Sequence, residues 1–256
     1  MFKKYKSLKK RIYQLEMEGL SKWASVQSPF KVKTPNYLIS EKLGVAYLRV
    51  PKAGCSSIQA LILATEKPKL YEEVKDEIKE RVGFLHHTQG IFETSKNPPE
   101  NLIKFTFVRH PFNRLLSFYK NQINPSKVLT GEMENQLQEQ LGKYGFYIGM
   151  SFEDFVELLT NDRDALNEYH VRPQVEFLFS DNGLNVDYLG KLENISRHQS
   201  VLGRLIGKPD LKLMRLNSTG GSDWRSSGYF NQQIVSELEK VYKQDLILLG
   251  YDVSQM

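Results

Sequence analysis

The chain has 256 residues, of which 40% are hydrophobic and 25% are charged, and its formal net charge is +5 at pH 7. This composition excludes global disorder, and the length suits one large α/β domain or two small ones. The single cysteine, Cys55, excludes an internal disulfide and a cysteine-based metal cluster, so we expect a reducing, cytoplasmic compartment.

Residues 1–36 are interpreted as a basic amphipathic helix followed by a connector. The apolar residues of the helix recur at helical spacing, with lysines between them: Phe2, Tyr5, Leu8, Ile12 and Leu15. The simpler interpretation is a helix that packs on the domain and leaves its charged face in water. The alternative is a peripheral contact with a membrane surface or a polyanion. No long apolar run follows, so we predict neither a signal peptide nor a membrane span.

Strand patterns alternate with helix patterns along the rest of the chain. The predicted strands are 43–50, 101–108 and 186–192, with 211–216 as a further candidate. The predicted helices are 57–64, 71–82, 111–123, 151–159, 195–206 and 229–249, and residues 124–149 are expected to be irregular or partly helical. This alternation predicts a single α/β domain over residues 1–256. We expect three layers and a P-loop-like fold, with a mostly parallel central sheet flanked by helices.

The stretch RVPKAGCSS, residues 49–57, joins the first of these strands to its helix and has the chemistry of a phosphate loop. Gly54 allows the backbone to bend close to a ligand, and the start of the following helix favours an anion. Ser56 and Ser57 add hydroxyl donors, and Lys52 adds a mobile positive charge. The stretch lacks the Gly-Lys-Ser/Thr ending of a nucleotide-binding P-loop. A plain turn with a surface lysine is the alternative.

The stretch FVRHPFNRLLSFY, residues 107–119, is a second strand-to-helix turn with phosphate chemistry. Arg109 stands where the strand ends, and its planar guanidinium suits a phosphate. Ser117 lies about two helical turns further on, and Arg114 is either a second clamp or a surface arginine. An arginine that only caps or pairs is the alternative for Arg109. Since ligands of such sheets bind beyond the carboxyl ends of the strands, the two turns predict a ligand with two separate anionic groups.

Several segments resemble one enzyme family. PKAGCSSI resembles the 5′-phosphosulfate loop of sulfotransferases, and FVRHPFNRLLSFY resembles their 3′-phosphate element. The segments HVRPQVEFL, VDYLGKLENI, RLNST and YFNQQIVSELEKVYKQDLILLGYD also resemble segments of the carbohydrate (Golgi-type, family 2) branch and its bacterial relatives. The resemblance spans residues 43–252 and implies 3′-phosphoadenosine 5′-phosphosulfate (PAPS) as co-substrate. We expect no metal, because lysine, arginine and backbone amides can neutralise this ligand. Two departures are serines where relatives often have threonine, and Leu192 where they usually have phenylalanine.

The resemblance implies a role for each matching residue. The 5′ side of PAPS would be held by Pro51, Lys52, Ala53, Gly54, Cys55, Ser56 and Ser57. Arg109 and Ser117 would hold the 3′-phosphate. The relatives' membrane anchor and luminal cysteines have no counterpart here, so we do not carry over their Golgi location.

Sulfonate transfer to a hydroxyl requires a general base and a stabilised leaving phosphate. Lys52 is predicted to stabilise the leaving group. Relatives carry a catalytic-type histidine between the two phosphate motifs, so the resemblance implies a base in this interval. We predict His87 as the base, with His86 as the second candidate. His110 is interpreted as structural or ligand-adjacent, and His170 with Arg172 as part of the acceptor site.

We therefore predict a PAPS-dependent sulfotransferase that acts on a saccharide or glycoconjugate hydroxyl. One alternative is an ATP-dependent, P-loop-like kinase, which would want a metal-binding acid and a true P-loop. The other is a non-enzymatic polyanion-binding module. We see no nucleic-acid-binding module, and the sequence does not indicate an oligomeric state.

Overall fold

The computed structural model describes residues 35–80, 85, 90–124, 131–180, 183–214, 216 and 223–253. The chain divides into two compact units. The first unit comprises Met1–Val108 and Glu176–Asn217, and the second comprises Arg109–Val175 and Ser218–Met256. The predicted N-terminal helix lies outside the described residues.

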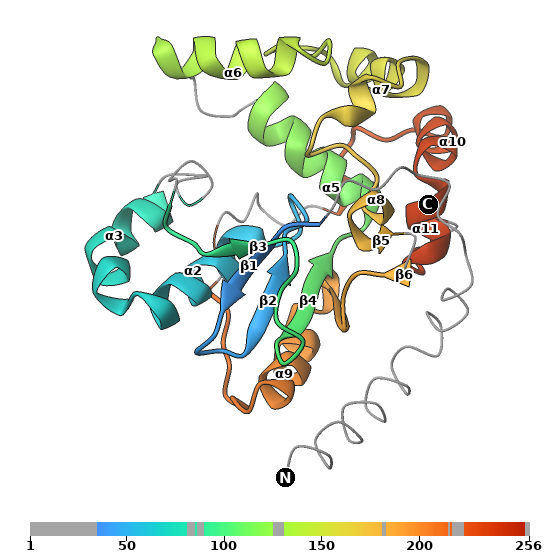
Figure 1. The fold of residues 1–256 in the computed structure, drawn as a ribbon. Helices are drawn as coiled ribbons and strands as arrows, with labels where there is room; N and C mark the ends of the chain where they lie inside the picture. The colour runs from blue at the N-terminus through green and yellow to red at the C-terminus, as the bar shows by residue number, and fades with distance from the viewer. Residues whose placement is uncertain are drawn as a thin grey trace. The chain divides into compact units, whose positions relative to one another are not determined.

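The first unit contains a five-stranded sheet of order β3-β1-β2-β4-β7 (Figure 1). Its strands are β1 (Tyr37–Ser40), β2 (Val45–Leu48), β3 (Thr94–Ser95), β4 (Ile103–Val108) and β7 (Tyr188–Lys191). Strands β2, β4 and β7 are parallel, whereas β1 is antiparallel to both β2 and β3. The sheet is therefore mixed rather than mostly parallel, because β1 and β3 come from segments that we had not predicted as strands. A separate short pair, β5 (Phe179–Ser180) and β6 (Gly183–Leu184), is antiparallel.

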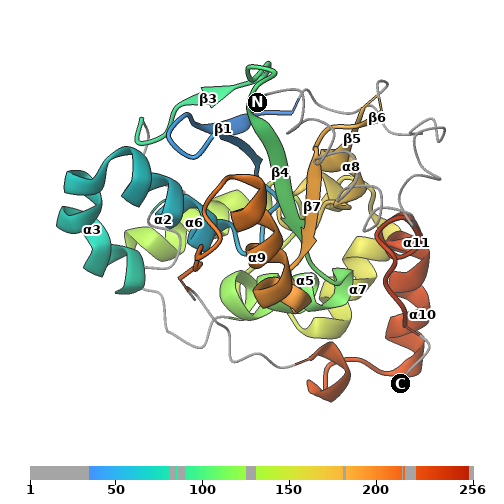
Figure 2. The same cartoon turned by 90° about the horizontal axis from the view of Figure 1, so that it is seen from below.

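One face of this sheet carries the core of the first unit. Tyr47, Phe105 and Tyr188 lie opposite one another on β2, β4 and β7, so their side chains share a face. They cluster with apolar residues of two helices, α2 (Cys55–Glu66) and α9 (Ile195–Leu205). Figure 2 shows α9 crossing in front of β4 and β7. This is the predicted α/β arrangement of a central sheet with flanking helices.

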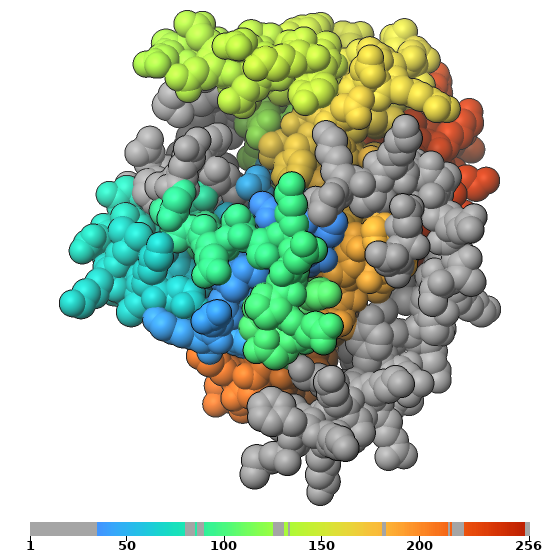
Figure 3. Space-filling model, in the orientation of Figure 1, coloured from blue at the N-terminus to red at the C-terminus, as the bar shows by residue number. Residues whose placement is uncertain are grey.

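Helix α3 (Pro68–Glu80) packs against α2 and exposes a charged surface. Its buried Ile78 clusters with Ala60 and Leu63 of α2. Part of α3 is visible in Figure 3, coloured teal. Its exposed Lys75 pairs with Glu72 at 2.7 Å, and such exposed pairs contribute little to stability.

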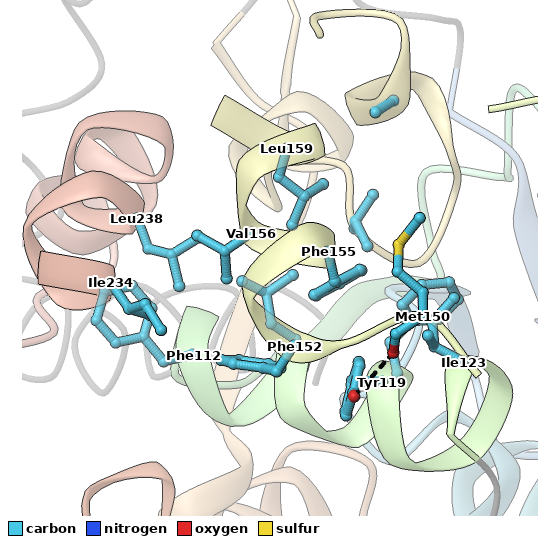
Figure 4. Packing of buried hydrophobic residues seen from close by; sticks show 14 of the residues in the cluster. Phe112, Tyr119, Ile123, Met150, Phe152, Phe155, Val156, Leu159, Ile234 and Leu238 are labelled. Atoms are coloured by element: carbon cyan, nitrogen blue, oxygen red, sulfur yellow. Dashed lines mark hydrogen bonds between the residues drawn. The ribbon is translucent and has the colours of Figure 1, made fainter. Parts of the chain in front are cut away.

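The second unit is helical. Its helices are α5 (Pro111–Phe118), a π-helical turn (Tyr119–Ile123), α6 (Glu132–Gly142), α7 (Phe152–Asn161), 3₁₀ turns at Ala165–Asn167 and Trp224–Ser226, α10 (Gln232–Val241) and α11 (Lys243–Leu248). The short α8 (Val175–Leu178) crosses the boundary between the units. Figure 4 shows the aromatic core, in which Phe112, Phe152 and Phe155 pack together and the Tyr119 hydroxyl donates to the Met150 carbonyl at 3.0 Å.

Two predicted elements differ in the structure. The candidate strand 211–216 has no strand in its described residues. The amide of Leu213 donates to the side chain of Gln199 at 3.1 Å, and that of Leu216 to Ser57 Oγ at 3.5 Å, so side chains take the place of a strand partner. The predicted helix 229–249 is two helices separated at Tyr242, whose buried hydroxyl donates to the Val171 carbonyl at 2.6 Å. The predicted cap of α7 is confirmed, because Ser151 Oγ accepts from the Asp154 amide.

Candidate donor-binding and active site

The first turn, residues 49–57, reverses the chain between β2 and α2 through two left-handed residues. Lys52 has φ +63°, the one positive φ at a non-glycine position among the described residues, and Gly54 has φ +86°. Backbone turns that include left-handed residues form concave groups of amides that bind anions. A left-handed lysine costs conformational energy, and such strain concentrates at functional sites.

Helix α2 begins at Cys55 without an acidic side chain in its first turn. The positive end of the helix dipole faces the turn, and the first turn of α2 carries no carboxylate of its own that would oppose an anion there. Ser57 is anchored, since its amide donates to the Gly54 carbonyl at 3.1 Å and its Oγ accepts from the Leu216 amide. Ser56 is partly exposed.

The remaining predicted residues of this turn are buried and support it by packing. Pro51 and Ala53 are buried, and Cys55 is a buried member of the apolar cluster of the first unit. Any contact from these three residues to an anion would therefore come from the backbone.

The end of β7 lies against the same turn. Leu192 Cδ1 would be 3.0 Å from a Cβ atom placed on Gly54, so leucine fills the space beside the turn. Lys191 is half-buried, and burial lowers the pKa of its ammonium group, while Glu193 acts in the opposite direction. We had not predicted Lys191 as a site residue. Its register position opposite Val108, at the carboxyl edge of the sheet, is information that only strand pairing supplies.

The second turn starts at Arg109, which follows directly after β4. Because β2 and β4 are adjacent and parallel, both strands end at the same edge of the sheet. The side-chain amide of Gln174 holds the backbone of Arg109 on both sides. The Arg109 amide donates to Gln174 Oε1 at 3.0 Å, and Gln174 Nε2 donates to the Arg109 carbonyl at 2.8 Å.

A fully buried carboxylate fixes this glutamine. Asp245 Oδ2 accepts from the Gln174 amide at 2.9 Å and from Gln174 Nε2 at 3.2 Å, and Oδ1 accepts from the Val175 amide at 2.9 Å. Burial raises the pKa of Asp245, and these donors together with Arg114 act in the opposite direction. Gln174 and Asp245 lie within two segments that carried the family resemblance, but nothing local in the sequence indicates that they meet.

Arg114 is neither a second phosphate clamp nor a surface arginine. Its side chain is fully buried, and it donates to the carbonyls of Arg172 at 2.7 Å and Tyr169 at 3.4 Å. Burial lowers its pKa, which nearby Asp245 partly offsets. Arg114 therefore fixes the segment that leads to Gln174. Ser117, one turn further along α5, is buried with 7% exposure.

His110 caps α5 and is structural. Its Nδ1 accepts from the Phe112 amide at 3.2 Å, and Pro111 occupies the first helical position, as expected. The imidazole is buried and stacks on Trp224, with ring centroids 5.6 Å apart.

His170 forms a dyad with Glu168. His170 Nδ1 and Glu168 Oε1 are 2.8 Å apart, and the imidazole stacks on Phe118 with centroids separated by 5.5 Å. Burial alone would raise the pKa of Glu168, but hydrogen bonds and charge from His170 hold it below its ordinary value. Arg172 donates to the Asn167 carbonyl at 2.6 Å. His86 and His87, the predicted bases, lie outside the described residues.

Comparison with known proteins identifies the family. The family model described as "Sulfotransferase family" matches residues 35–252. The chain belongs to the sulfotransferase family. The sulfotransferase is 26% identical to rat carbohydrate sulfotransferase 11 over 252 residues, which cover 87% of this chain and 70% of the relative. It is 25% identical to mouse carbohydrate sulfotransferase 12, covering 89% of this chain and 65% of the relative. No solved structure matches the chain.

The match confirms that the chain is a sulfotransferase enzyme and that it resembles the carbohydrate branch. Membership of this family excludes both alternatives, the ATP-dependent kinase and the non-enzymatic binding module. The predicted cytoplasmic location is wrong, because the matching relatives are carbohydrate sulfotransferases of the Golgi. A single cysteine was too weak a basis for assigning a compartment. No helix among the described residues has the length and apolar character that crossing a membrane requires.

Proposed function

We propose that this sulfotransferase transfers the sulfonate group of PAPS to a hydroxyl of a carbohydrate or glycoconjugate acceptor. The first turn carries the proposal, because left-handed Lys52 and Gly54 precede a helix start that lacks acidic side chains. This arrangement fits a doubly charged 5′ group. The carbohydrate acceptor is supported by the names of the matching relatives. We further propose that β2, this turn and α2 form a P-loop-like unit.

Each turn would bind one end of the donor. Lys52, Gly54, Ser56 and Ser57, with the backbone of Pro51, Ala53 and Cys55, would hold the 5′ side. Arg109 and Ser117 would hold the 3′-phosphate, which distinguishes the donor from ADP and ATP. The guanidinium of Arg109 can bind such a phosphate with two parallel hydrogen bonds.

Bound PAPS supplies an activated sulfonate. The Lys52 ammonium group stabilises the negative charge that develops on the leaving phosphate. His87, or His86 in its place, takes the proton from the acceptor hydroxyl. His170 and Arg172 contribute to acceptor binding, with the His170 ring held by Glu168. Replacing His87, His86 and His170 singly by alanine tests these assignments, since loss of the base lowers kcat and loss of an acceptor contact raises the acceptor KM.

The first experiment is thermal unfolding with 3′-phosphoadenosine 5′-phosphate (PAP), the expected product, beside ADP with and without Mg²⁺. At 100 times its dissociation constant PAP should add about 2.7 kcal/mol of stability. For a chain of this size the expected rise in Tm is roughly 5 °C. An equal rise with ADP and Mg²⁺ would contradict the proposal. Because we predict no metal, the chelator EDTA is expected to leave activity with PAPS unchanged.

A further inference from the structure

We propose that Gln174 and Asp245 are positioning residues, which act through Arg109 to set the affinity for the donor's 3′-phosphate. This inference rests on the proposed function, in which Arg109 binds that phosphate. All three residues belong to the second unit, and every contact between them lies within it.

Gln174 pairs with the backbone just beyond the end of β4. The pairing of β4 with β7 ends at Val108 and Lys191, one residue before Arg109. From there the side-chain amide of Gln174 continues the pairing, with one donor and one acceptor aligned on the Arg109 carbonyl and amide. A side chain thus serves Arg109 as a substitute for a neighbouring strand.

Asp245 fixes the orientation of the Gln174 side-chain amide. Gln174 Nε2 faces both the Arg109 carbonyl and Asp245 Oδ2, and both of these are acceptors. Only the NH₂ end of the glutamine side chain can satisfy them, so Asp245 selects one of the two amide orientations. Asp245 also accepts from the backbone amides of Gln174 and Val175. Gln174 is therefore held by Asp245 through both its backbone and its side chain.

The position of the Arg109 backbone affects how its side chain can bind a phosphate. Gln174 fixes the peptide groups on both sides of the Arg109 Cα atom, which sets the direction in which the side chain leaves the backbone. Two parallel hydrogen bonds to a phosphate require an arginine with a defined orientation. Without Gln174 the Arg109 side chain remains, but its backbone is held less firmly. We therefore expect Gln174→Ala to weaken phosphate binding without abolishing it.

The test uses PAP and adenosine 5′-phosphate, which lacks the 3′-phosphate, with dissociation constants measured by calorimetry on the full chain. The ratio of the two constants measures recognition of the 3′-phosphate. Arg109→Ala should remove the discrimination, and Gln174→Ala should reduce it about 10-fold. In the Arg109→Ala background, Gln174→Ala should have no further effect on the ratio. Gln138→Ala is the matched control, because Gln138 Oε1 accepts from the Ile148 amide at 2.9 Å in the same unit.

A second variant covers the case in which Gln174→Ala folds poorly. Gln174→Glu has nearly the same shape but donates a hydrogen bond only when its carboxyl group is protonated. Its affinity for PAP, relative to wild type at each pH, should therefore recover as the pH falls from about 8 to about 5.5. An ordinary packing defect would not produce this recovery.

The outcomes separate the inference from the function on which it rests. If the wild type does not prefer PAP over adenosine 5′-phosphate, the proposed 3′-phosphate site itself fails. If the wild type discriminates but Gln174→Ala keeps the full ratio, the positioning role is wrong and the proposed function stands. Additive losses from Arg109→Ala and Gln174→Ala, or a relative affinity of Gln174→Glu that does not change with pH, would also overturn the positioning role.

Discussion

Leu192 Cδ1 lies 3.0 Å from the position that a Cβ atom on Gly54 would occupy. The end of β7 therefore closes one side of the turn that precedes α2. Two constraints therefore favour glycine at position 54. Leu192 leaves little space for a side chain, and a φ of +86° is unfavourable for any residue that has one.

Gly54→Ala is expected to weaken PAP binding as well as to destabilise the fold. The left-handed backbone should cost about 1 kcal/mol, and the added methyl group must displace Leu192 or the turn. Calorimetry with PAP and chemical denaturation measure the two effects. Gly207→Ala is the control, because Gly207 has φ +73° with open space around it. Equal losses of PAP affinity in both variants would contradict a role for the turn.

Lys52→Ala is expected to lower kcat about 100-fold or more with a smaller change in the KM for PAPS. Its ammonium group should matter most when charge develops on the leaving phosphate. Alanine keeps a Cβ atom, so the backbone cost at φ +63° stays similar. Lys42→Ala is the control, since Lys42 Nζ binds the Glu66 carbonyl at 2.7 Å. An Lys52→Ala variant with unchanged kcat would rule out the proposed role.

Arg114→Ala is expected to destabilise the protein by about 3 kcal/mol. The change removes the guanidinium that binds two backbone carbonyls and the positive charge that acts on buried Asp245. Urea denaturation gives the free energy of unfolding. The exposed Arg163 offers a control, and Arg163→Ala should change that energy by less than about 0.5 kcal/mol. Similar values for both variants would show that Arg114 is not a structural anchor.

Glu168→Gln is expected to change how stability depends on pH. The folded protein holds the pKa of Glu168 below its ordinary value of 4.5, so its carboxylate stabilises the fold above that pH. This contribution is lost as the pH falls through the lowered pKa. The difference in unfolding free energy between wild type and Glu168→Gln should therefore be larger at neutral pH and shrink under acidic conditions. A difference that stays constant with pH would mean that Glu168 does not act through its charge.

The family, most of the helices and strands, and the two turns could be predicted from local patterns in the sequence. Lys52 to Ser57 and Arg109 to Ser117 are local motifs, in which residue type, a glycine or proline and the start of a helix follow one another within a few positions. Local spacing also determined the cap at Ser151 and the strand that became β4. Such signals survive in sequence because they depend on neighbours along the chain.

Contacts between residues far apart in the sequence could not be predicted, because they depend on how the chain packs. Gln174 reaches Arg109 and Asp245 over 65 and 71 positions of sequence, and no periodicity encodes such a contact. The antiparallel place of β1 and the absence of a strand at 211–214 likewise depend on partners elsewhere in the chain. Arg114 could not be assigned from sequence, because an arginine that binds phosphate and one that binds backbone carbonyls occur in the same local sequence pattern. What separates them is burial, which depends on how the whole second unit packs.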